Sequence, residues 1–225
     1  MKKSEREELL KQKLEDMLVY ERALWDKGIL YVAGADEVGR GPLAGPVCAA
    51  CVVLPQDFDI IGVNDSKKLS EKKRSELYGI IIERALAYGI GLIESERIDE
   101  INILNATKEA MLIAVSDASS MLMDRADENE NAEIGHLLID AVKLPEAGIP
   151  GTAIIKGDEK SVSIAAASII AKVTRDRIMT EFDNIYPGYG FFSNKGYGTE
   201  AHYKGLRLHG PTPIHRMSFL TKLTV

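Results

Sequence analysis

The spacing of apolar residues changes along the chain from a helical pattern to a strand-like one. Leu10, Leu14, Met17 and Leu18 recur at intervals of three and four residues, which predicts an amphipathic helix over residues 4–24. Beyond this segment the apolar residues gather in short runs, whose length and composition favour β-strands.

The short apolar runs are bounded by glycine, proline and polar residues, which are typical of turns. A Gly/Pro-rich turn joins the first two runs and predicts that they pair directly. The predicted strands are residues 28–35, residues 46–54, YGIGLIES (88–95), HLLIDAV (136–142) and TAIIKGD (152–158).

Helical patterns alternate with the later strands. Ser70 stands where it would cap a helix that runs to about Ala87. The other predicted helices cover residues 103–123, 161–182 and 199–209.

Two polar segments are predicted to be loops: the acidic DRADENENAEIG (124–135) and the Gly/Tyr-rich YPGYGFFSNKGYGT (186–199). The chain has no internal repeat and no low-complexity linker. Strands that pair early and alternate with helices later predict a single α/β domain, in which helices pack on a mixed sheet.

The composition is that of a globular protein. The chain has 225 residues, of which 45% are hydrophobic, and this length suits one large domain. No apolar run approaches the roughly 20 residues of a membrane-spanning helix. The lysines that open MKKSEREELLKQKLEDM are not followed by the apolar region of a signal peptide. We therefore expect a soluble, cytoplasmic protein that does not bind a membrane.

The two cysteines, Cys48 and Cys51, form a C-x-x-C spacing inside the apolar run GPVCAACVVL. In a redox enzyme this spacing lies at the start of a helix, whereas residues three apart on a strand point to opposite faces. We predict that both thiols fill the apolar core. A metal site or a disulfide is the alternative.

Charge is unevenly distributed along the chain, whose net charge is −6. From Lys172 to Val225 eight Lys and Arg stand against four acids, so this stretch carries +4 and the first 171 residues carry −10. A second basic run, SKKLSEKKR, covers residues 66–74. Such runs either are solvated helix faces or guide a phosphate backbone onto one side of the molecule, and both interpretations stay open.

Three of the apolar runs end at acidic residues: Asp36 with Glu37, Asp140, and Asp158. In open α/β sheets, sites form at the carboxyl ends of the strands, so these four carboxylates could converge. Unit charges at ~4 Å repel by about 4 kcal/mol per pair at an effective dielectric near 20, and convergence therefore implies bound divalent cations. Oxygen ligands without His or Cys favour Mg²⁺ or Mn²⁺. Two such ions would bracket an in-line phosphoryl displacement.

Each of these acids also has an ordinary structural interpretation. Asp158 precedes a predicted helix and could be its N-cap, and Asp140 could simply end its strand in a turn. Asp36 and Glu37 are neighbours, which point to opposite faces of an ideal strand. Both reach one site only if the strand twists or bulges, which the Gly-Arg-Gly sequence at residues 39–41 permits.

Six motifs occur in one order along the chain: GADEVGRGPLAGPV, DSKKLS, LLIDAV, IIKGDEKSVSIAAASIIAKVTRD, YPGYGFFSNKGYGT and HGPTPIHRMSF. Together they resemble a bacterial ribonuclease HII, a type 2 ribonuclease H, from about Leu30 to Phe219. The related ribonuclease HIII would carry Asp-Glu-Ser-Gly-Lys-Gly in the first motif and an added N-terminal domain. This chain has Val38 and Arg40 at the differing positions.

The resemblance implies an RNase H-like fold, with a mixed sheet flanked by helices and a helical C-terminal part. Residues 28–225 would form the catalytic domain and residues 1–27 an N-terminal helical extension. The resemblance also implies a monomeric endonuclease that hydrolyses the RNA strand of RNA–DNA hybrids. It would incise 5′ to single ribonucleotides in duplex DNA and leave 3′-hydroxyl and 5′-phosphate ends.

The acidic quartet of the family falls on Asp36, Glu37, Asp140 and Asp158, which by resemblance are the catalytic residues and the ligands of Mg²⁺ or Mn²⁺. The interpretation of these acids as metal ligands thus gains a second argument, independent of their spacing. It also favours catalysis over mere binding, because a binding module gains nothing from four anions near a phosphate.

The resemblance also implies a set of substrate-binding residues. Gly39, Arg40 and Gly41 would grip the ribose 2′-hydroxyl and its phosphates, since glycine lets the main chain approach a ribose closely. The 2′-hydroxyl is the group that distinguishes RNA from DNA at one position. Tyr197 would stack at the junction with the following deoxyribose, and Lys67 would contact the backbone near the scissile phosphate.

Three other functions stay open: a ribonuclease restricted to long hybrids, a nucleic-acid-binding module without catalysis, and a small-molecule phosphatase that uses the same ions. We interpret His136, His202, His209 and His215 as structural. The alternative is that a C-terminal histidine assists proton transfer.

Overall fold

A computed structural model describes residues 3–126 and 132–221 of the protein. The strands are β1 (Val32–Val38), β2 (Val47–Val53), β3 (Ala87–Ile93), β4 (His136–Asp140) and β5 (Gly151–Ile154). Within the described residues they form a five-stranded sheet of order β3-β2-β1-β4-β5. The pairs β1–β2 and β2–β3 are antiparallel, and the pairs β1–β4 and β4–β5 are parallel. The predicted mixed sheet is confirmed.

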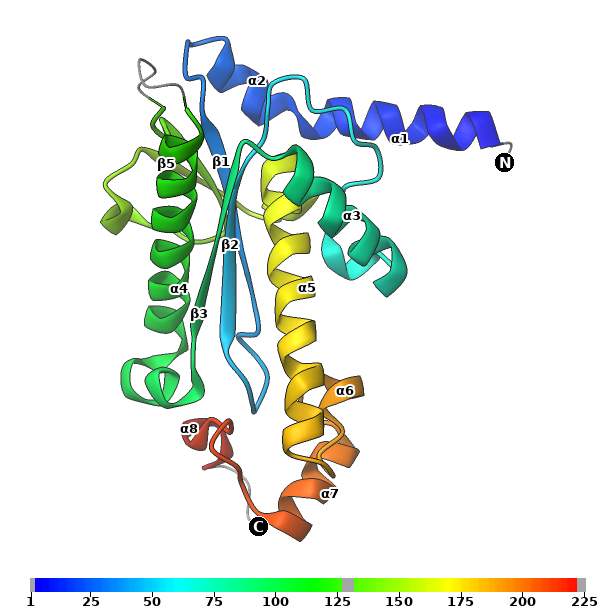
Figure 1. Ribbon diagram of the computed structural model, residues 1–225, viewed down its shortest axis with the longest axis vertical. Coiled ribbons are helices and arrows are strands. Elements are labelled where there is room, and N and C mark those ends of the chain that lie inside the picture. The colour runs from blue at the N-terminus through cyan, green and yellow to red at the C-terminus, as the bar shows by residue number, and fades with distance from the viewer. Residues whose placement is uncertain (1–2, 127–131, 222–225) are drawn as a thin grey trace.

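One long helix covers each face of the sheet: α4 (Ser95–Arg125) on one side and α5 (Val162–Ile185) on the other (Figure 1). Alternation along β1 separates two apolar cores, because Ala35 packs into the core on the α4 side whereas Gly34 faces α5. A Cβ on Gly34 would lie 2.1 Å from the backbone of Ser163. Glycine at this position therefore lets α5 lie directly on the strand.

The two cysteines of β2 are free and buried in opposite cores, Cys51 on the α4 side and Cys48 on the α5 side. Burial raises the pKa of each thiol to about 12. Their predicted role in core packing is confirmed, and the disulfide alternative is wrong because the two side chains point to opposite faces.

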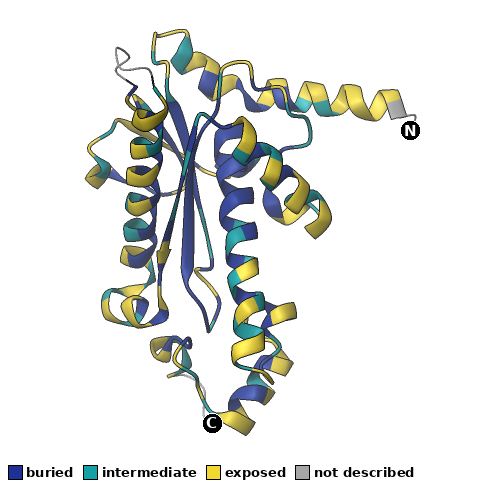
Figure 2. Cartoon of the chain, viewed as in Figure 1, coloured by how far each residue is buried: buried dark blue, intermediate teal, exposed yellow. Residues whose placement is uncertain are grey.

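The N-terminal segment forms two helices, α1 (Lys3–Met17) and α2 (Val19–Trp25), and not the single helix predicted over residues 4–24. The break at Leu18 lets both Leu14 and Leu18 join the core on the α5 side. Most of α1 is exposed (Figure 2). The boundary between an N-terminal extension and a catalytic domain stays a prediction.

Helix α3 (Glu71–Arg84) begins where it was predicted, because the hydroxyl oxygen of Ser70 accepts a hydrogen bond from the amide of Lys73 at 3.3 Å. It ends earlier than predicted, because Ala87 already pairs with Val53 at the start of β3. Sheet pairing thus decided the end of a helix that its own sequence could have extended.

Helix α4 starts earlier than the helix predicted over residues 103–123 and carries a kink at Asn102, whose φ is 65°. The side-chain oxygen of Asn102 accepts hydrogen bonds from the amides of Leu104 and Asn105. The predicted start therefore marks the point at which the helix resumes after its kink, with Asn102 as an internal cap.

The C-terminal part is helical, as predicted, and lies at the end of the molecule away from α1 (Figure 1). Thr199 caps α7 over nearly the predicted range, whereas the predicted Gly/Tyr loop contains the short helix α6. The helices of this part are α6 (Phe191–Asn194), α7 (Glu200–His209) and α8 (Met217–Leu220). Residues 127–131 of the predicted acidic loop lie outside the described residues. None of the described helices is long and apolar enough to span a membrane.

Candidate active site

Asp36 and Asp140 lie side by side on adjacent parallel strands. The pairing of β1 with β4 ends with Ala35 opposite Ile139, and the two aspartates are the next residues of their strands. Because Gly34 faces α5, alternation places Asp36 on the α5 face as well. Asp36 is only 6% exposed.

Glu37 reaches the same end of the sheet without a bulge. The β1–β2 ladder is unbroken through Glu37, which pairs with Ala49, so the bulge that the sequence allowed does not occur in this described strand. Glu37 lies beyond the last β1–β4 pair, and its carboxylate comes within electrostatic reach of Asp140. Its Oε1 accepts a hydrogen bond from Nη1 of Arg40 at 3.2 Å.

The sequence predicted that Asp158 ends a strand. Asp158 lies instead in a 3₁₀ turn (Gly157–Glu159) between β5 and α5. The amide of Gly157 donates a hydrogen bond to Oδ1 of Asp140 at 2.7 Å, which holds the turn against β4. The alternative that Asp158 is the helix N-cap is wrong, because Ser161 caps α5. Asp158 is therefore available to the site.

The four predicted acids share one electrostatic environment. Burial, followed by the charges of Glu37 and Asp140, raises the pKa of Asp36 well above its ordinary value. Burial also raises the pKa of Glu37, and Asp140 adds to this effect. Burial, with the neighbouring carboxylates of Asp65 and Asp140, raises the pKa of Asp158 to about 6.

Asp65 is a fifth carboxylate at this site, and sequence analysis missed it. Its charge adds to burial in raising the pKa of Asp158, and its side chain accepts a hydrogen bond from the amide of Lys67, in a 3₁₀ turn (Ser66–Lys68). Burial lowers the pKa of Lys67, but the charges of Asp36 and Asp65 outweigh this effect and raise it. The ammonium group therefore lies within the field of the acids. Asp65 opens the DSKKLS motif, but its polar surroundings gave no reason to choose it.

The acidic side chains do not converge on one point in this structure. In the part of the chain that the structure describes, no three Asp, Glu, His or Cys side chains form a group that could hold a metal ion. Hydrogen bonds from Gly157 and Arg40 hold Oδ1 of Asp140 and Oε1 of Glu37 in place. Oε2 of Glu37 is buried and has no hydrogen-bond partner among the described residues. An orphan carboxylate oxygen among acids of raised pKa fits a divalent cation, which would neutralise them after small side-chain shifts.

Two fully buried arginines lie against the turn at residues 39–41. Arg216 donates hydrogen bonds to the carbonyl oxygens of Gly39 at 2.6 Å and Arg40 at 3.0 Å. Gly39 has a φ of 93°, and a Cβ there would lie 2.3 Å from Nε of Arg175. Only glycine fits this position without displacing that arginine.

Tyr197 lies beside the same turn. The amide of Leu43 donates a hydrogen bond to the carbonyl oxygen of Gly196 at 2.8 Å, which joins the two segments. A Cβ on Gly41 would lie 3.6 Å from the Tyr197 ring. The ring is 46% exposed and Arg40 is exposed as well, so this surface is open to a ligand.

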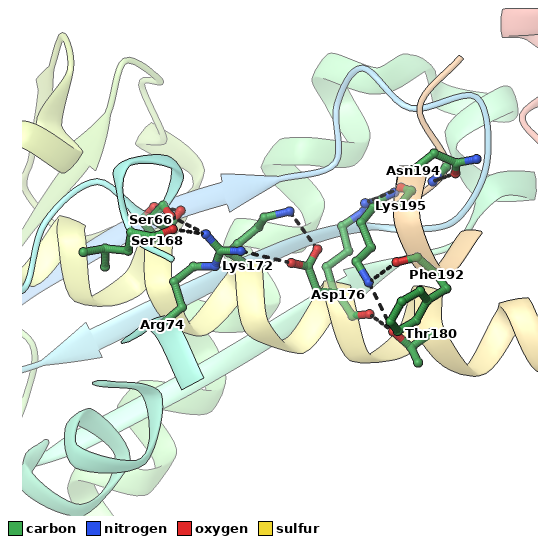
Figure 3. Close-up of polar contacts among 12 residues, drawn as sticks. Ser66, Arg74, Ser168, Lys172, Asp176, Thr180, Phe192, Asn194 and Lys195 are labelled. Atoms are coloured by element: carbon green, nitrogen blue, oxygen red, sulfur yellow. Dashed lines mark hydrogen bonds and ion pairs between the residues drawn. The ribbon is translucent and has the colours of Figure 1, made fainter. Parts of the chain in front are cut away.

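A polar network along α5 holds the segments that carry Lys67 and Tyr197 (Figure 3). At one end Ser168 donates a hydrogen bond to Oγ of Ser66 at 2.8 Å, and Arg74 donates to the Ser66 carbonyl at 2.9 Å. At the other end the Lys195 ammonium donates to Oγ1 of Thr180 at 3.2 Å. One helix therefore carries both the turn that bears Lys67 and the loop that precedes Tyr197.

The chain matches one known protein family over most of its length. The family model described as Ribonuclease HII matches residues 33–222. The chain is 52% identical over 212 residues to a ribonuclease HII of Clostridioides difficile (strain 630), covering 94% of this chain and 78% of that protein. It is 55% identical over 218 residues to one of Bacillus cereus (strain B4264), covering 97% and 80%. The chain belongs to the ribonuclease HII family.

Solved structures confirm the RNase H-like fold of this ribonuclease HII. The PCNA:RNase HII complex from Archaeoglobus fulgidus matches with a TM-score of 0.67 and 26% identity, over 85% of this chain and 95% of that one. Bst-RNase HIII in complex with Mn²⁺ matches with a TM-score of 0.63 and 21% identity, over 85% and 67%. As a ribonuclease HII, the protein is a ribonuclease H, a hydrolase that cleaves the RNA of RNA–DNA hybrids.

The histidines of this ribonuclease HII have different environments. Nε2 of His136 contacts Oγ1 of Thr152 across β4 and β5, and His209 is exposed on α7. His202 and His215 are buried in the C-terminal part, with their Nε2 atoms 3.0 Å apart. The motif pattern gave no signal for this pairing, because the two residues lie on separate segments.

Proposed function

We propose that this ribonuclease HII incises 5′ to single ribonucleotides embedded in duplex DNA, in addition to cleaving hybrids, and leaves 3′-hydroxyl and 5′-phosphate ends. The position of the Tyr197 ring, 3.6 Å from where a Cβ on Gly41 would lie, carries the proposal. An open glycine turn can approach one ribose, and an adjacent aromatic ring can stack on the sugar that follows it.

The turn at residues 39–41 is prepared for a ribose before the substrate arrives. Arg216 holds the carbonyl groups of Gly39 and Arg40, so binding does not have to order them. A site whose polar groups bond a hydroxyl rejects the analogue that lacks it by about 10⁴-fold. The exposed guanidinium of Arg40 supplies a planar pair of donors for a phosphate.

We assign the metal sites to Asp36, Glu37, Asp140 and Asp158, with Mg²⁺ or Mn²⁺ as the ion. Two such ions, when bound, would lower the pKa of the attacking water and offset the charge on the departing 3′-oxygen. The raised pKa values of Asp36 and Asp158 support this assignment. Bst-RNase HIII, a protein of the same fold, was solved with Mn²⁺.

The chain's own groups orient the reaction. The Gly157 amide fixes one oxygen of Asp140, and the main chain of Glu37 fixes one oxygen of Asp36 at 2.8 Å. We expect these bonds to orient the remaining oxygens toward the site. Lys67, whose ammonium lies in the field of the acids, would contact the backbone beside the scissile phosphate.

The test is the mapping of cleavage sites on a DNA duplex that contains one ribonucleotide, with and without chelator. Incision on the 5′ side with 3′-hydroxyl and 5′-phosphate products, abolished by chelator, is the expected result. Cleavage of hybrid alone would favour an enzyme restricted to long hybrids. Salt-dependent binding without product would favour a binding module, and hydrolysis of a phosphomonoester alone would favour a phosphatase.

The enzyme's assembly and location belong to the same proposal. We expect a monomer that acts in the cytoplasm on RNA–DNA hybrids and ribonucleotide-containing duplexes. Light scattering of the purified protein would measure its mass directly, and a dimer would contradict the first expectation.

A further inference from the structure

Two buried histidines connect parts of the site that come from different segments. The Nε2 atoms of His202 and His215 are 3.0 Å apart. Nδ1 of His202 lies 3.0 Å from the carbonyl oxygen of Tyr197, and Nδ1 of His215 lies 2.9 Å from the amide nitrogen of Thr212. These contacts form one continuous line of hydrogen bonds from Thr212 to Tyr197.

The partners at the two ends fix the tautomer of each ring. The Thr212 amide can only donate, so Nδ1 of His215 accepts and the proton of this ring is on Nε2. The Tyr197 carbonyl can only accept, so Nδ1 of His202 carries the proton and Nε2 of this ring is an acceptor. Nε2–H of His215 therefore donates to Nε2 of His202, and both ends require the same direction.

The surroundings keep both rings neutral. His202 and His215 are almost completely buried, among the rings of Tyr189 and Phe191. Burial lowers the pKa of His202, and burial with the neighbouring His202 lowers that of His215 to about 4. A second proton on His202 would lie on its Nε2, directly opposite the Nε2–H group of His215, and the hydrogen bond between the rings would be lost.

His215 is attached to the segment that follows the turn at residues 39–41. It forms a β-bridge with Ala44, and the next residue, Arg216, donates from its amide to the carbonyl oxygen of Leu43 at 2.9 Å. The Arg216 side chain also holds Gly39. The position of the His215 ring is therefore coupled to that of the turn.

His202 belongs to the other side, on α7, and holds Tyr197. A main-chain hydrogen bond from Leu43 to Gly196 already links the two sides. The buried Arg175 adds a bridge, because it donates hydrogen bonds to the carbonyl oxygens of Lys195 and Ala44. These links hold the residues before Tyr197, whereas the bond between the two histidines holds Tyr197 itself, through its carbonyl oxygen.

We propose that the hydrogen bond between His202 and His215 positions Tyr197 against the turn at residues 39–41, and thereby sets the preference for a ribonucleotide–deoxyribonucleotide junction over a continuous hybrid. This inference rests on the proposed incision at single ribonucleotides. A continuous hybrid offers a ribose at every step of its RNA strand, so its cleavage tolerates a displaced Tyr197. A single ribonucleotide requires both contacts at one step. The histidines are positioning residues, since they act through Tyr197.

The experiment compares kcat/KM on a single-ribonucleotide duplex with kcat/KM on a continuous hybrid. His215→Phe keeps an aromatic ring but removes the donor, whereas His215→Gln keeps an N–H group near the former Nε2. We expect His215→Phe to lower the ratio by about tenfold, the effect of losing one hydrogen bond of ordinary strength. His215→Gln should restore most of the ratio. His209→Phe, on the exposed part of α7, is the matched control and should leave it unchanged.

A double variant tests whether the effect passes through Tyr197. In a Tyr197→Ala background, His215→Phe should lower the ratio no further. Nitrogen-15 NMR of the wild-type protein at pH 7 supplies a readout that does not depend on any variant. It should show protons on Nδ1 of His202 and on Nε2 of His215, with both rings neutral.

The outcomes separate this inference from the proposed function. Wild-type protein that cleaves hybrid but does not incise at a single ribonucleotide overturns the proposed function, and this inference with it. Wild-type incision with an unchanged ratio in His215→Phe overturns the inference alone. So does a loss that persists in the Tyr197→Ala background. If His215→Phe does not fold, two other results would overturn the inference. One is the opposite pair of tautomers in the NMR spectrum, and the other is a low ratio of kcat/KM values in a folded His215→Gln variant.

Discussion

The buried guanidinium of Arg216 donates to the carbonyl oxygen of Gly39 at 2.6 Å. The same group bonds the carbonyl oxygens of Arg40 and Gly45, and in the described residues it forms no ion pair within 4.0 Å. Burial of a charge is costly unless hydrogen bonds compensate it. Here main-chain carbonyls provide the compensation, which makes the arginine an internal support for the turn.

Replacing this arginine should weaken both the fold and ribose recognition. Arg216→Met leaves buried carbonyl oxygens without donors, and we expect a loss of roughly 3 kcal/mol in the free energy of unfolding. KM for the single-ribonucleotide duplex should rise, because the turn is no longer held. Urea denaturation and steady-state kinetics measure the two effects. Arg207→Met, on the exposed face of α7, is the control, and equal behaviour of the two variants would contradict the role of Arg216.

The four acids could be found from sequence because each lies at or near the end of an apolar run, where the register of a sheet fixes positions. Parallel pairing then brought Asp36 beside Asp140, as alternation and strand direction require. The location of Asp158 was less predictable. It follows β5 by a turn that is fixed by a tertiary hydrogen bond, from the Gly157 amide to Asp140.

The supporting residues could not be predicted, because their partners are distant in sequence. Arg216 and Arg175 read as members of a basic C-terminal stretch, yet both are buried on main-chain carbonyls. Asp65 directly precedes the basic run at residues 66–74, and nothing in its sequence surroundings distinguished it. The break at Leu18 could not be predicted either. The helical pattern of apolar residues continues through it, and only packing against the core decides where the chain turns.

Removing one carboxylate from the acidic site should raise the stability of the protein and lower its activity. Asp36→Asn takes away a buried charge whose pKa is raised by burial, Glu37 and Asp140, so the metal-free variant should melt at a higher temperature than the wild type. Cleavage should fall by roughly 10²-fold or more, because the variant lacks one of the proposed metal ligands. Added Mg²⁺ should raise the melting temperature of the wild type and leave that of the variant unchanged.

The exposed Asp59, which pairs with Arg84 on the surface, supplies the control for this experiment. Asp59→Asn should respond to Mg²⁺ as the wild type does. If Asp36→Asn kept near-native turnover, or if Mg²⁺ stabilised it fully, Asp36 would be removed from the metal site.

The histidine pair should make stability depend on pH. The pKa of His215 is about 4 in the folded protein, below its ordinary value of 6.5. Between these values the unfolded chain binds a proton that the folded protein does not, so stability falls as the pH is lowered from about 6.5 to about 4. The ring contacts that of His202, and His215 also lines an open surface pocket together with Glu96, Asp99 and Glu100.

Melting temperatures of the wild type and His215→Gln between pH 7 and pH 4.5 test this dependence. Titrating groups remote from the pair contribute to both proteins and cancel in the difference between them, which therefore reports on His215 and on the His202 ring in contact with it. The wild type should lose stability relative to the variant as the pH falls. A difference that does not change with pH would show that the ring is not held neutral.

A buried carboxylate adds a polar link to the apolar packing between the N-terminal helices and α5. Oε1 of Glu21 accepts hydrogen bonds from Oγ of Ser161 at 2.6 Å and from the amide of Ser163 at 3.0 Å. These residues begin α5, directly after the turn that carries Asp158. Helix α2 therefore supports the start of the helix whose position sets that of Asp158.

Glu21→Ala removes these bonds and should cost roughly 2–4 kcal/mol of stability, with a fall in kcat as the Asp158 turn loosens. Glu21→Gln keeps an acceptor oxygen and removes a buried charge, so it should retain most of both. Glu8→Ala, on the exposed face of α1, is the control. Deletion of residues 1–26 also removes the buried Leu14 and Leu18, so it should lower the melting temperature more than Glu21→Ala does and also lower kcat, with KM for nucleic acid unchanged. A rise in KM without loss of stability would instead assign these helices to the substrate-binding surface.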